Sequence, residues 1–444
     1  MSGSGEAFVG RERVELASVR LRQPERHQMA MVVTCPDDLV SATHPVRLML
    51  AVVERLDLKQ LYEPIQARRG VAGRDATHHQ LLVALWLHAC TCGIGSAREL
   101  ARRTKESAPF QWLCGGVTVN HRLLSDFRTD HAAALDALFT QVIASLVDNE
   151  VVRGSRVSQD GVRVRVGAGA GSFRSEGLLQ KQLDEAREHV EQLRAQVDSP
   201  EYQALSARPR AARKRVAAER LEQAVAQLPE LKRKQAKAER QAGQGKFGQK
   251  IRQRQPRIST TDAEARVMKM PNGGFNPAVN VQLATDTESR ATLGVQVSSE
   301  GSDSAGLNEP MRRQVEERSG SKVEQHLLDG GYLRTAYIQQ AQADGVELFI
   351  PPKMAKSPLR RGLELEPKPS DSEAVLAWKR RMSSEAGKEI YKQRAATSET
   401  VNADLRSYRG LGQITVRGLA EAQRVAFWCA LAYNILHFAA VLLG

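Results

Sequence analysis

The stretch HLLDGGYLRTAYIQQAQADGVELFIPP, residues 326–352, decides the fold of this chain. An apolar run ends at Asp329, two glycines and a tyrosine follow, and helical spacing then leads into a second short apolar run. This order predicts a strand, a tight turn, a helix and another strand, which places Asp329 at the carboxyl edge of a parallel sheet. Polar groups at that edge face a crevice, so Asp329 is a candidate for chemistry.

The segments before this stretch supply the rest of a sheet. RVSQDGVRVRV alternates apolar and polar positions as a half-buried strand does, and two later runs separated by a short turn predict a hairpin. The predicted strands cover residues 156–166, 276–286, 291–301, 323–329 and 346–352. Three mainly antiparallel strands followed by two strands joined through helices predict an α/β fold class with an RNase H-like mixed sheet flanked by helices.

Residues 43–150 show helical spacing and predict an all-helical N-terminal domain, preceded by a loosely ordered lead-in over residues 1–42. The short helices of this domain carry basic residues, among them Arg102 and Arg103 in SARELARRTKE. Such helices resemble the helix-turn-helix manner of presenting side chains to DNA, whereas a solvated basic face is the simpler alternative. DNA binding by residues 43–150 is therefore a hypothesis.

A basic helical insertion at residues 175–257 interrupts the predicted catalytic domain, which spans residues 151–444. Apolar residues recur alternately four and three positions apart from Leu179 and again from Ala218, and prolines separate the two runs, which predicts a coiled-coil hairpin. Sixteen Lys and Arg against four Asp and Glu give residues 208–257 a charge of +12, out of +13 for the chain. Such a segment attracts polyanions, most often nucleic acid. A DNA-gripping or dimerising arm and a tolerated, solvated insertion are the two interpretations.

Composition narrows the cellular setting. The five cysteines are scattered and odd in number, which predicts a reducing cytoplasm and no thiolate metal cage. The N-terminus has no apolar core of the length that a secretory signal needs. Residues 425–444 are apolar enough to approach a membrane span, but Asn434 and His437 lie among them, so we expect burial against the sheet. We expect a cytoplasmic protein, nucleoid-associated when bound to DNA, with an exposed proline-rich linker at 353–372.

Two carboxylates fall where the predicted sheet brings strand ends together, Asp160 on the first strand and Asp329 at the end of the fourth. Two ionised groups that lie a few ångströms apart repel unless a divalent cation lies between them. Glu399, in the helical region near the C-terminus, would complete a hard-oxygen site suited to Mg²⁺ or Mn²⁺. Two such ions can activate a water or a 3′-hydroxyl and stabilise the leaving oxygen in phosphodiester cleavage and strand transfer.

Three motifs in this chain resemble those of the insertion-sequence transposases of the DDE superfamily, the group with an IS4-like catalytic core and a helical N-terminal domain. That family carries an Asp-Gly in a strand, an Asp in a D-x-G-Y turn and a Y-x-x-R…E signature on a helix. Here the corresponding motifs are QDGVRV at 159–164, LLDGGYL at 327–333 and YKQRAATSE at 391–399. The resemblance extends over most of residues 45–440.

The resemblance implies that Asp160, Asp329 and Glu399 are the metal-binding carboxylates, with Mg²⁺ or Mn²⁺ as cofactor. Four residues separate the signature's arginine from Glu399, one more than in the most familiar form of the signature. Glu389 and Asp404 are therefore rival third ligands.

The signature also implies contacts with DNA. Tyr391 and Arg394 occupy its aromatic and basic positions, whose implied role is contact with DNA phosphates or with the flipped terminal base near the cut. Arg406 takes the place usually held by Lys, which keeps the charge and changes the donor geometry. Tyr332, in the turn after the second aspartate, is expected to serve packing and hydrogen bonding inside the domain.

The leading hypothesis is a DNA transposase that cleaves at the terminal inverted repeats of its element and joins the ends to target DNA. Its partners would be double-stranded DNA and a second copy of the chain, in a homodimeric active complex without a membrane. The alternative is a catalytically inactive or repurposed transposase-derived protein that only binds DNA. A nuclease that cleaves structured nucleic acid without joining ends needs the same metal site, and a strand-transfer assay separates it from the first.

Overall fold

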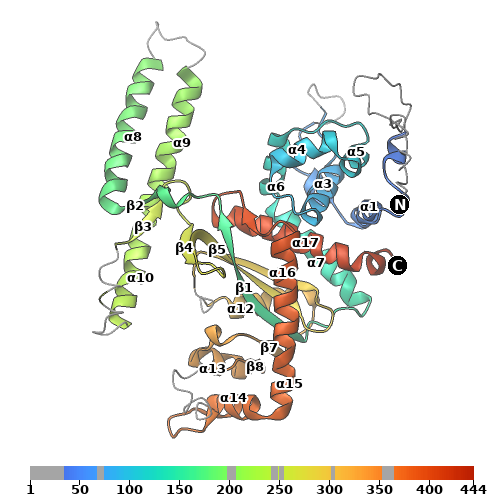
Figure 1. Cartoon of the computed structure of the whole chain (residues 1–444), viewed down its shortest axis with the longest axis vertical. Helices are drawn as coiled ribbons and strands as arrows, with labels where there is room; N and C mark the ends of the chain where they lie inside the picture. Colours follow the sequence, from blue (N-terminus) through green and yellow to red (C-terminus); the bar gives the residue numbers. More distant parts are fainter. Residues whose placement is uncertain are drawn as a thin grey trace, which may run out of the picture.

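The computed structural model describes residues 35–67, 75–197, 207–241, 249, 255–301, 306–352 and 365–444. A mixed sheet occupies the middle of the molecule, between a helical domain from the N-terminal part of the chain and a pair of long helices that project on the other side (Figure 1). The predicted lead-in over 1–42 lies mostly outside the described residues, as does the predicted linker at 353–372.

The central strand of the sheet is β1 (Arg156–Val166), which pairs antiparallel with β5 (Phe275–Asp286) and parallel with β7 (Gln325–Leu327). On the far edge of β5 lies the antiparallel β6 (Thr292–Ser298), and beyond β7 lies the parallel β8 (Glu347–Phe349). The strands therefore follow the order β6, β5, β1, β7, β8. The predicted α/β class with a mixed sheet is confirmed, and each predicted strand is present.

Four short strands were missed by the sequence analysis. β4 (Arg266–Lys269) pairs with β5, and the two-residue β9 (Gln413–Ile414) pairs with β1. β2 (Phe173–Ser175) and β3 (Arg257–Ser259) form a separate antiparallel pair at the base of the insertion. Strands of two to four residues are too short to show an alternating pattern, so only their partners reveal them.

The outer edge of β6 is closed by side chains from two helices. Gln314 of α12 (Asn308–Ser319) accepts a hydrogen bond from the Val295 amide, and Gln423 of α17 (Leu419–Leu443) binds both Val295 and Val297. Unpaired strand edges invite pairing with other chains. Two helices from distant parts of the chain thus protect this edge.

The apolar C-terminal stretch forms α17, which is long and apolar enough to cross a membrane by length and composition, yet most of it is buried inside the protein. It packs against α3 and α7 of the helical domain and against β6 of the sheet. Asn434 is fully buried and exchanges two hydrogen bonds with the backbone of Thr292. The helix therefore joins the two domains in one core, as the sequence analysis expected of a helix buried against the sheet.

The N-terminal domain is all-helical, as predicted. Its buried residues include Trp86, which donates a hydrogen bond to the Leu124 carbonyl, and Phe139, which packs on Phe427 of α17. After a 3-10 turn at Pro36–Leu39, its helices are α1 (Pro45–Arg55), α2 (Lys59–Tyr62), α3 (His79–Thr91), α4 (Ala97–Glu106), α5 (Ala108–Cys114), α6 (His121–Asp130) and α7 (Ala132–Asp148).

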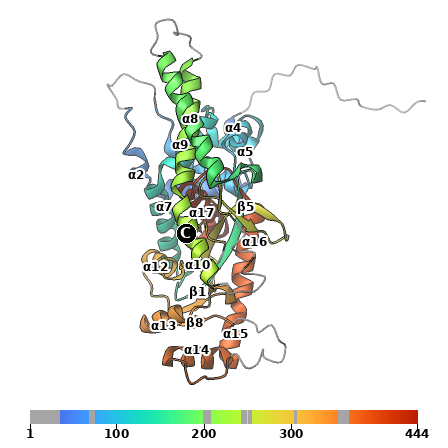
Figure 2. The same cartoon turned by 90° about the vertical axis from the view of Figure 1, so that its left-hand side faces the viewer.

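The basic insertion contains α8 (Glu176–Val197), α9 (Ala207–Ala226) and α10 (Leu228–Gln241). α8 and α9 lie side by side and stand away from the sheet (Figure 2). Arg187 of α8 pairs with Glu222 of α9 at 3.0 Å. Leu179 and Leu183 of α8 and Ala218 and Ala224 of α9 are buried. Most of the basic run after α10 lies outside the described residues.

The long C-terminal helical region is broken once. α14 (Glu373–Ser383) ends at Ser384, whose side chain caps the next helix, α15 (Glu385–Arg394), by accepting from the Gly387 amide. α15 continues without a break through a π-helical turn (Ala395–Glu399) into α16 (Thr400–Tyr408). α13 (Thr335–Ala343) fills the crossover between β7 and β8.

Candidate active site

Strand pairing brings Asp160 and Asp329 to neighbouring positions. The parallel register of β1 and β7 sets Ser158 opposite Leu327, which is the last paired position. Two residues beyond it on each strand are the two aspartates. Adjacent strands lie about 4.8 Å apart, and residues two positions apart share a face. The parallel pair therefore carries Asp160 within β1 and Asp329 in the turn directly after β7, at neighbouring positions along the two strands.

The turn after β7 holds Asp329 in place. Its Oδ1 accepts a hydrogen bond from the Gly331 amide at 2.6 Å, which starts a short 3-10 helix at Gly330–Tyr332. Tyr332 is fully buried and donates to Gln282 of β5. Gln159 of β1 donates to the same Gln282 oxygen at 3.1 Å. One buried glutamine thus ties together the strand and the turn that carry the aspartates, and Tyr332 has the packing role predicted for it.

The continuous helix from α15 to α16 packs on β1. It carries the residues of the third motif, which include Arg394 and Glu399. Ser398 and Ser158 are both buried and share a hydrogen bond between their hydroxyls. Arg156 of β1 donates to Gln393 Oε1 at 3.1 Å. These two contacts, on either side of Arg394, hold the signature helix against the strand that carries Asp160.

The Arg394 guanidinium lies between two of the predicted carboxylates. Its Nη2 is 3.1 Å from Asp160 Oδ1, and its Nη1 is 4.0 Å from Glu399 Oε1. The side chains of Arg394 and Asp160 are only 12% and 18% exposed, whereas that of Glu399 is 69% exposed. Asn402 donates to the other Asp160 oxygen at 3.3 Å. Asp160 is therefore held on both oxygens by residues of the signature helix.

Charge at this site is concentrated around Arg394. Burial alone lowers the pKa of its guanidinium, but the nearby Asp160, Tyr391, Asp329 and Glu399 together raise that pKa above its usual range. Burial raises the pKa of the Tyr391 hydroxyl, and the same three carboxylates raise it further. The charges of Asp160, Asp329 and Glu399 thus affect the pKa of both Tyr391 and Arg394. All five signature residues therefore lie near one another.

The carboxylates at this site do not form a metal-binding cluster within the described residues. Among the residues that the structure describes, no three His, Cys, Asp or Glu side chains stand close enough together to hold one. At this site a guanidinium of the chain itself, that of Arg394, takes the position of a cation between Asp160 and Glu399. Carboxylate oxygens that surround a cation are the donors that Mg²⁺ and Mn²⁺ prefer. The described arrangement therefore places a guanidinium between Asp160 and Glu399, and the carboxylates do not stand as a metal-binding cluster.

The two rival third ligands have other partners. Glu389 pairs with Lys392 on the surface of α15. Asp404 binds Arg409 at 3.0 Å and His437 of α17 at 3.1 Å. Glu399 is the rival that contacts Arg394.

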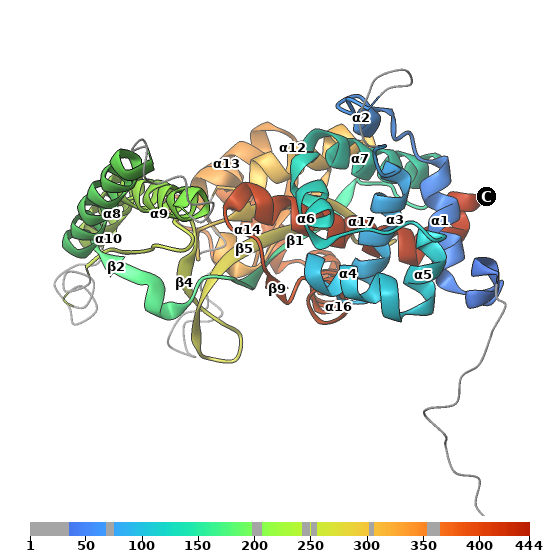
Figure 3. The ribbon, with the colours of Figure 1, turned by 90° about the horizontal axis from the view of Figure 1, so that it is seen from above.

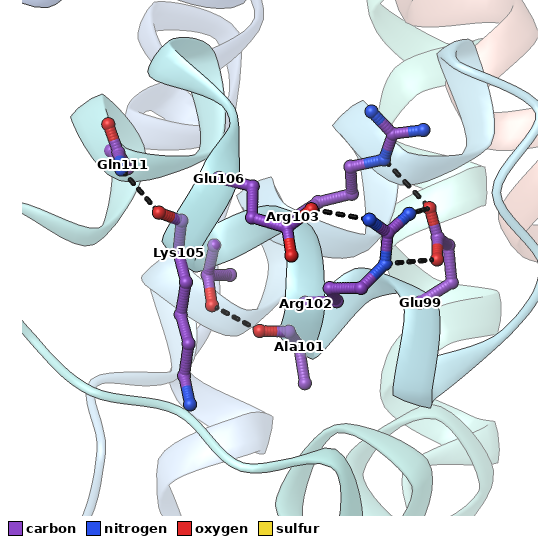
Figure 4. A network of polar contacts seen from close by, with 8 residues as sticks. Glu99, Ala101, Arg102, Arg103, Lys105, Glu106 and Gln111 are labelled. Carbon is purple, nitrogen blue, oxygen red and sulfur yellow. Dashed lines mark hydrogen bonds and ion pairs between the residues drawn. The ribbon is translucent and has the colours of Figure 1, made fainter. Parts of the chain in front are cut away.

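The predicted DNA-binding arginines of the helical domain are already paired. Figure 4 shows Arg102 between Glu99 and Glu106, and Arg103 bound to the same Glu99. Hydrogen bonds from Arg102 and then Arg103 lower the pKa of the Glu99 carboxyl. Arg406, in contrast, is exposed on α16 and has no ion pair in the described part of the chain.

Sequence reasoning missed three residues of the site. Asn402 lies one helical turn after Glu399, so the helical period itself could have identified it. Gln282 stands inside the buried strand β5, where a polar residue signals a hydrogen-bonding role. No sequence pattern points to Ser158, because its hydrogen-bond partner Ser398 is 240 positions away in the chain.

Comparison with known families agrees with these motifs. The chain matches the family described as Transposase DDE domain over residues 233–435, which include Asp329, Tyr391, Arg394 and Glu399. It matches a second family, described as Transposase domain (DUF772), over residues 34–130 of the helical domain. No curated protein and no solved structure matches the chain.

Proposed function

Because residues 233–435 match the Transposase DDE domain and residues 34–130 match the Transposase domain (DUF772), we propose that the chain cleaves DNA at the terminal inverted repeats of its own element and joins the ends to target DNA. The observation that carries this proposal is the ring of negative charge from Asp160, Asp329 and Glu399 around Arg394. Such a group of carboxylates, on β1 and in the turn after the neighbouring parallel strand β7, is where a hard cation and a phosphate can be held together.

The topology of the sheet supports an RNase H-like core. Its order β6, β5, β1, β7, β8 combines an antiparallel meander with two parallel strands joined through helices. Counted along the sequence, the first of these strands, β1, carries Asp160, and the fourth, β7, leads into the turn that carries Asp329. The helix that carries Glu399 packs on the same central strand, β1.

Each residue of the site has a proposed role. Asp160, Asp329 and Glu399 are the ligands for Mg²⁺ or Mn²⁺, and the bound ions supply an activated water or 3′-hydroxyl and stabilise the leaving oxygen. Tyr391 and Arg394 contact the DNA backbone beside the cut. Tyr332 and Gln282 are positioning residues, since they fix the turn of Asp329 without reaching the site.

Arg394 has two successive roles in this proposal. In the structure its guanidinium neutralises Asp160. Two ionised carboxylates that lie close together repel each other unless a positive charge lies nearby. With a divalent ion held by the carboxylates, Arg394 would no longer be needed for that neutralisation, and a DNA phosphate would offer the guanidinium a bidentate partner. The arginine then moves from the carboxylate to the phosphate.

DNA cleavage tests the proposal directly. A duplex that carries an end of the element is incubated with the protein and Mg²⁺, and nicking and strand transfer are followed on a denaturing gel. Asp329→Asn should abolish both reactions and retain binding, whereas Asp148→Asn, at an exposed position at the end of α7, should change neither. Cleavage by Asp329→Asn at the wild-type rate would overturn the assignment of the site.

One observation favours the alternative of a repurposed DNA-binding protein, namely that Arg394 fills the site where a metal would bind. That alternative predicts binding of the element end without any metal-dependent nicking. It also predicts that Asp160→Asn and Asp329→Asn leave every measurable property of the DNA complex unchanged. The same gel assay therefore separates the two functions.

The arrangement of domains supports contact with DNA on more than one side. Seen from above, the α8–α9 pair and the N-terminal helices lie on opposite sides of the sheet (Figure 3). We propose that the basic insertion acts as an arm, in which the predicted coiled coil grips DNA or a second copy of the chain, and that a homodimer forms the active complex. Sedimentation of the protein with and without element-end DNA tests the subunit number.

A further inference from the structure

Two hydrogen bonds join β1 to the helix that runs from α15 to α16. Ser158 shares a bond between hydroxyls with Ser398, and Asn402 donates through Nδ2 to Asp160 Oδ2 at 3.3 Å. Ser158 and Asp160 are two positions apart on the strand and share one face of the sheet. Ser398 and Asn402 are four positions apart on the helix and share one side of it. The two bonds therefore lie next to each other between the strand and the helix.

The carboxamide of Asn402 has only one possible orientation. The Asp160 carboxylate, which is paired with the Arg394 guanidinium at 3.1 Å, only accepts hydrogen bonds, so the amide nitrogen of Asn402 must face it. Asn402 Oδ1 therefore does not face Asp160. This oxygen is buried and has no hydrogen-bond partner within the described residues, and the residue as a whole is 8% exposed. A buried carbonyl oxygen without a partner costs free energy, so Asn402 Oδ1 requires a donor.

The serine pair has a donor to spare. Ser158 and Ser398 are 0% and 1% exposed, and in the part of the chain that the structure describes neither has a further side-chain hydrogen bond. Each hydroxyl carries one proton, and the bond between them uses only one of the two. A buried acceptor on Asn402 and a buried donor on the serine pair therefore lie on the same side of one helix.

The spacing between these two groups fits one water molecule. Two residues along an extended strand span about 6.7 Å, and four residues along a helix span about 6 Å. A bridging water spans about twice the length of a hydrogen bond between oxygen atoms, which is about 2.8 Å. A water at this position accepts the spare serine proton and donates to Asn402 Oδ1. It thus has the two polar partners that a buried water needs.

The chemistry of the partners favours water over other occupants at this position. A phosphate oxygen has no proton to donate to Asn402 Oδ1, and the charge of Asp160 would repel it. A cation would suit Asn402 Oδ1 but cannot accept the serine proton. A 3′-hydroxyl of DNA can both donate and accept, but Ser158 and Ser398 are too deeply buried for a group that is attached to a duplex. A free water molecule meets all of these conditions.

We propose that Ser158, Ser398 and Asn402 form a water-binding site beside Asp160, and that its water is the nucleophile of the nicking step. The inference rests on the proposed function and separates its two reactions. In nicking, the water oxygen forms a bond to phosphorus and the P–O3′ bond breaks. The water releases a proton to solvent, and the leaving 3′-oxygen takes one from solvent. In strand transfer a DNA 3′-hydroxyl replaces the water, so the water-binding site is not required.

Two substrates distinguish the two nucleophiles. An intact element-end duplex measures nicking by water, and a pre-nicked duplex with a free 3′-hydroxyl measures strand transfer. Asn402→Leu removes the acceptor and should slow nicking about tenfold more than strand transfer, the effect of one lost hydrogen bond. Asn402→Asp keeps an oxygen at this position and should preserve the wild-type ratio of the two rates even where both fall. Asn149→Leu, at an exposed position after α7, should change neither rate.

An equal loss of nicking and strand transfer in Asn402→Leu would show that Asn402 only positions Asp160, and would overturn the proposed nucleophile. Circular dichroism of each variant confirms that it is folded. A wild type that performs neither reaction would overturn the proposed function itself.

A crystal structure of the DNA-free protein, at a resolution that shows ordered water, tests the water-binding site independently of activity. One water molecule should lie within hydrogen-bond distance of Asn402 Oδ1 and of a hydroxyl of the Ser158–Ser398 pair. The same position should hold no water in Asn402→Leu. Wild-type crystals without a water at this position would overturn the water-binding site and leave the proposed function standing.

Discussion

Arg394 and Glu399 lie on the same side of their helix although they are five positions apart, because the backbone between them forms a π-helical turn. In a regular α-helix these positions would differ by about 140° around the axis. A π turn takes up one extra residue, and such turns occur often at functional sites. The extra residue that this chain has in the signature is thus absorbed locally, and the two side chains still meet.

This relationship predicts the effect of two deletions. Removal of Ala396 from the π turn should restore a regular α-helix and leave Arg394 and Glu399 in contact, so cleavage should persist. Removal of Ala403, an equally exposed alanine in the regular helix α16, should rotate the rest of the helix by about 100° and abolish cleavage. Gel assays on both variants check this, and equal loss of activity in the two would contradict it.

In the proposed function, Arg394 competes with divalent ions for Asp160. Arg394→Gln removes that competitor, so Mn²⁺ should bind about tenfold more tightly in the absence of DNA, the lower end of the effect of one neighbouring charge. Cleavage should fall at the same time, because the phosphate contact is lost. Isothermal titration with Mn²⁺ measures the affinity, with Arg313→Gln as the control. Weaker Mn²⁺ binding by Arg394→Gln would show that the arginine supports the metal site instead.

Tyr332→Phe should weaken the site from a distance. It removes the hydroxyl that donates to the buried Gln282, so the free energy of unfolding should fall by about 1–2 kcal/mol. Turnover should fall while the affinity for DNA stays constant, because only the turn of Asp329 loosens. Tyr408→Phe is the matched control, since Tyr408 is 66% exposed. Urea unfolding and gel assays give both quantities, and equal stability of the two variants would refute the positioning role.

Stability should depend on pH through His326. This histidine is fully buried, and burial lowers its pKa to about 3. An unfolded histidine has a pKa of about 6.5. Below that pH the unfolded chain binds a proton at His326 that the native state does not bind. The free energy of unfolding therefore falls by about 1.4 kcal/mol per pH unit down to about pH 3. The stability due to neutral His326 is complete above pH 6.5.

His326→Asn keeps a polar side chain near Tyr337, whose hydroxyl lies 3.0 Å from His326 Nδ1, and removes the titration. Urea unfolding between pH 4.5 and 7 should therefore show a shallower loss of stability than in the wild type. His121→Asn, at an exposed position, serves as the control. A slope identical to that of the wild type would show that His326 does not control acid stability.

The ion pairs on α4 predict a gain of function. Glu99→Gln frees Arg103 and leaves Arg102 with Glu106 alone, while the position keeps a good helix former, so DNA should bind more tightly and with a steeper salt dependence if this helix meets phosphates. Anisotropy at several salt concentrations measures both effects. Glu309→Gln, which frees Arg313, is the control. Unchanged binding after Glu99→Gln would remove α4 from the DNA interface.

Much of the fold followed from local patterns. The strands that later proved to be β1, β5, β6, β7 and β8, and the helices around them, show their periods in the sequence itself, because burial of one face repeats every two or 3.6 residues. The short β2, β3, β4 and β9 exist only through their partners. The sequence pattern also does not predict the break at Ser384 or the π turn, because helical spacing continues across both.

The sequence by itself determined the order of the elements and the identity of the charged residues, because both are properties of the chain read locally. Only the tertiary structure decided which side chain each charged residue contacts. Asn402 reaches Asp160 across 242 positions, and Arg394 stands between Asp160 and Glu399, through strand register and helix packing. Arg406 likewise comes beside β1 only when the C-terminal helices pack on the sheet. Contacts of this kind depend on the summed packing of the whole core, which no local pattern records.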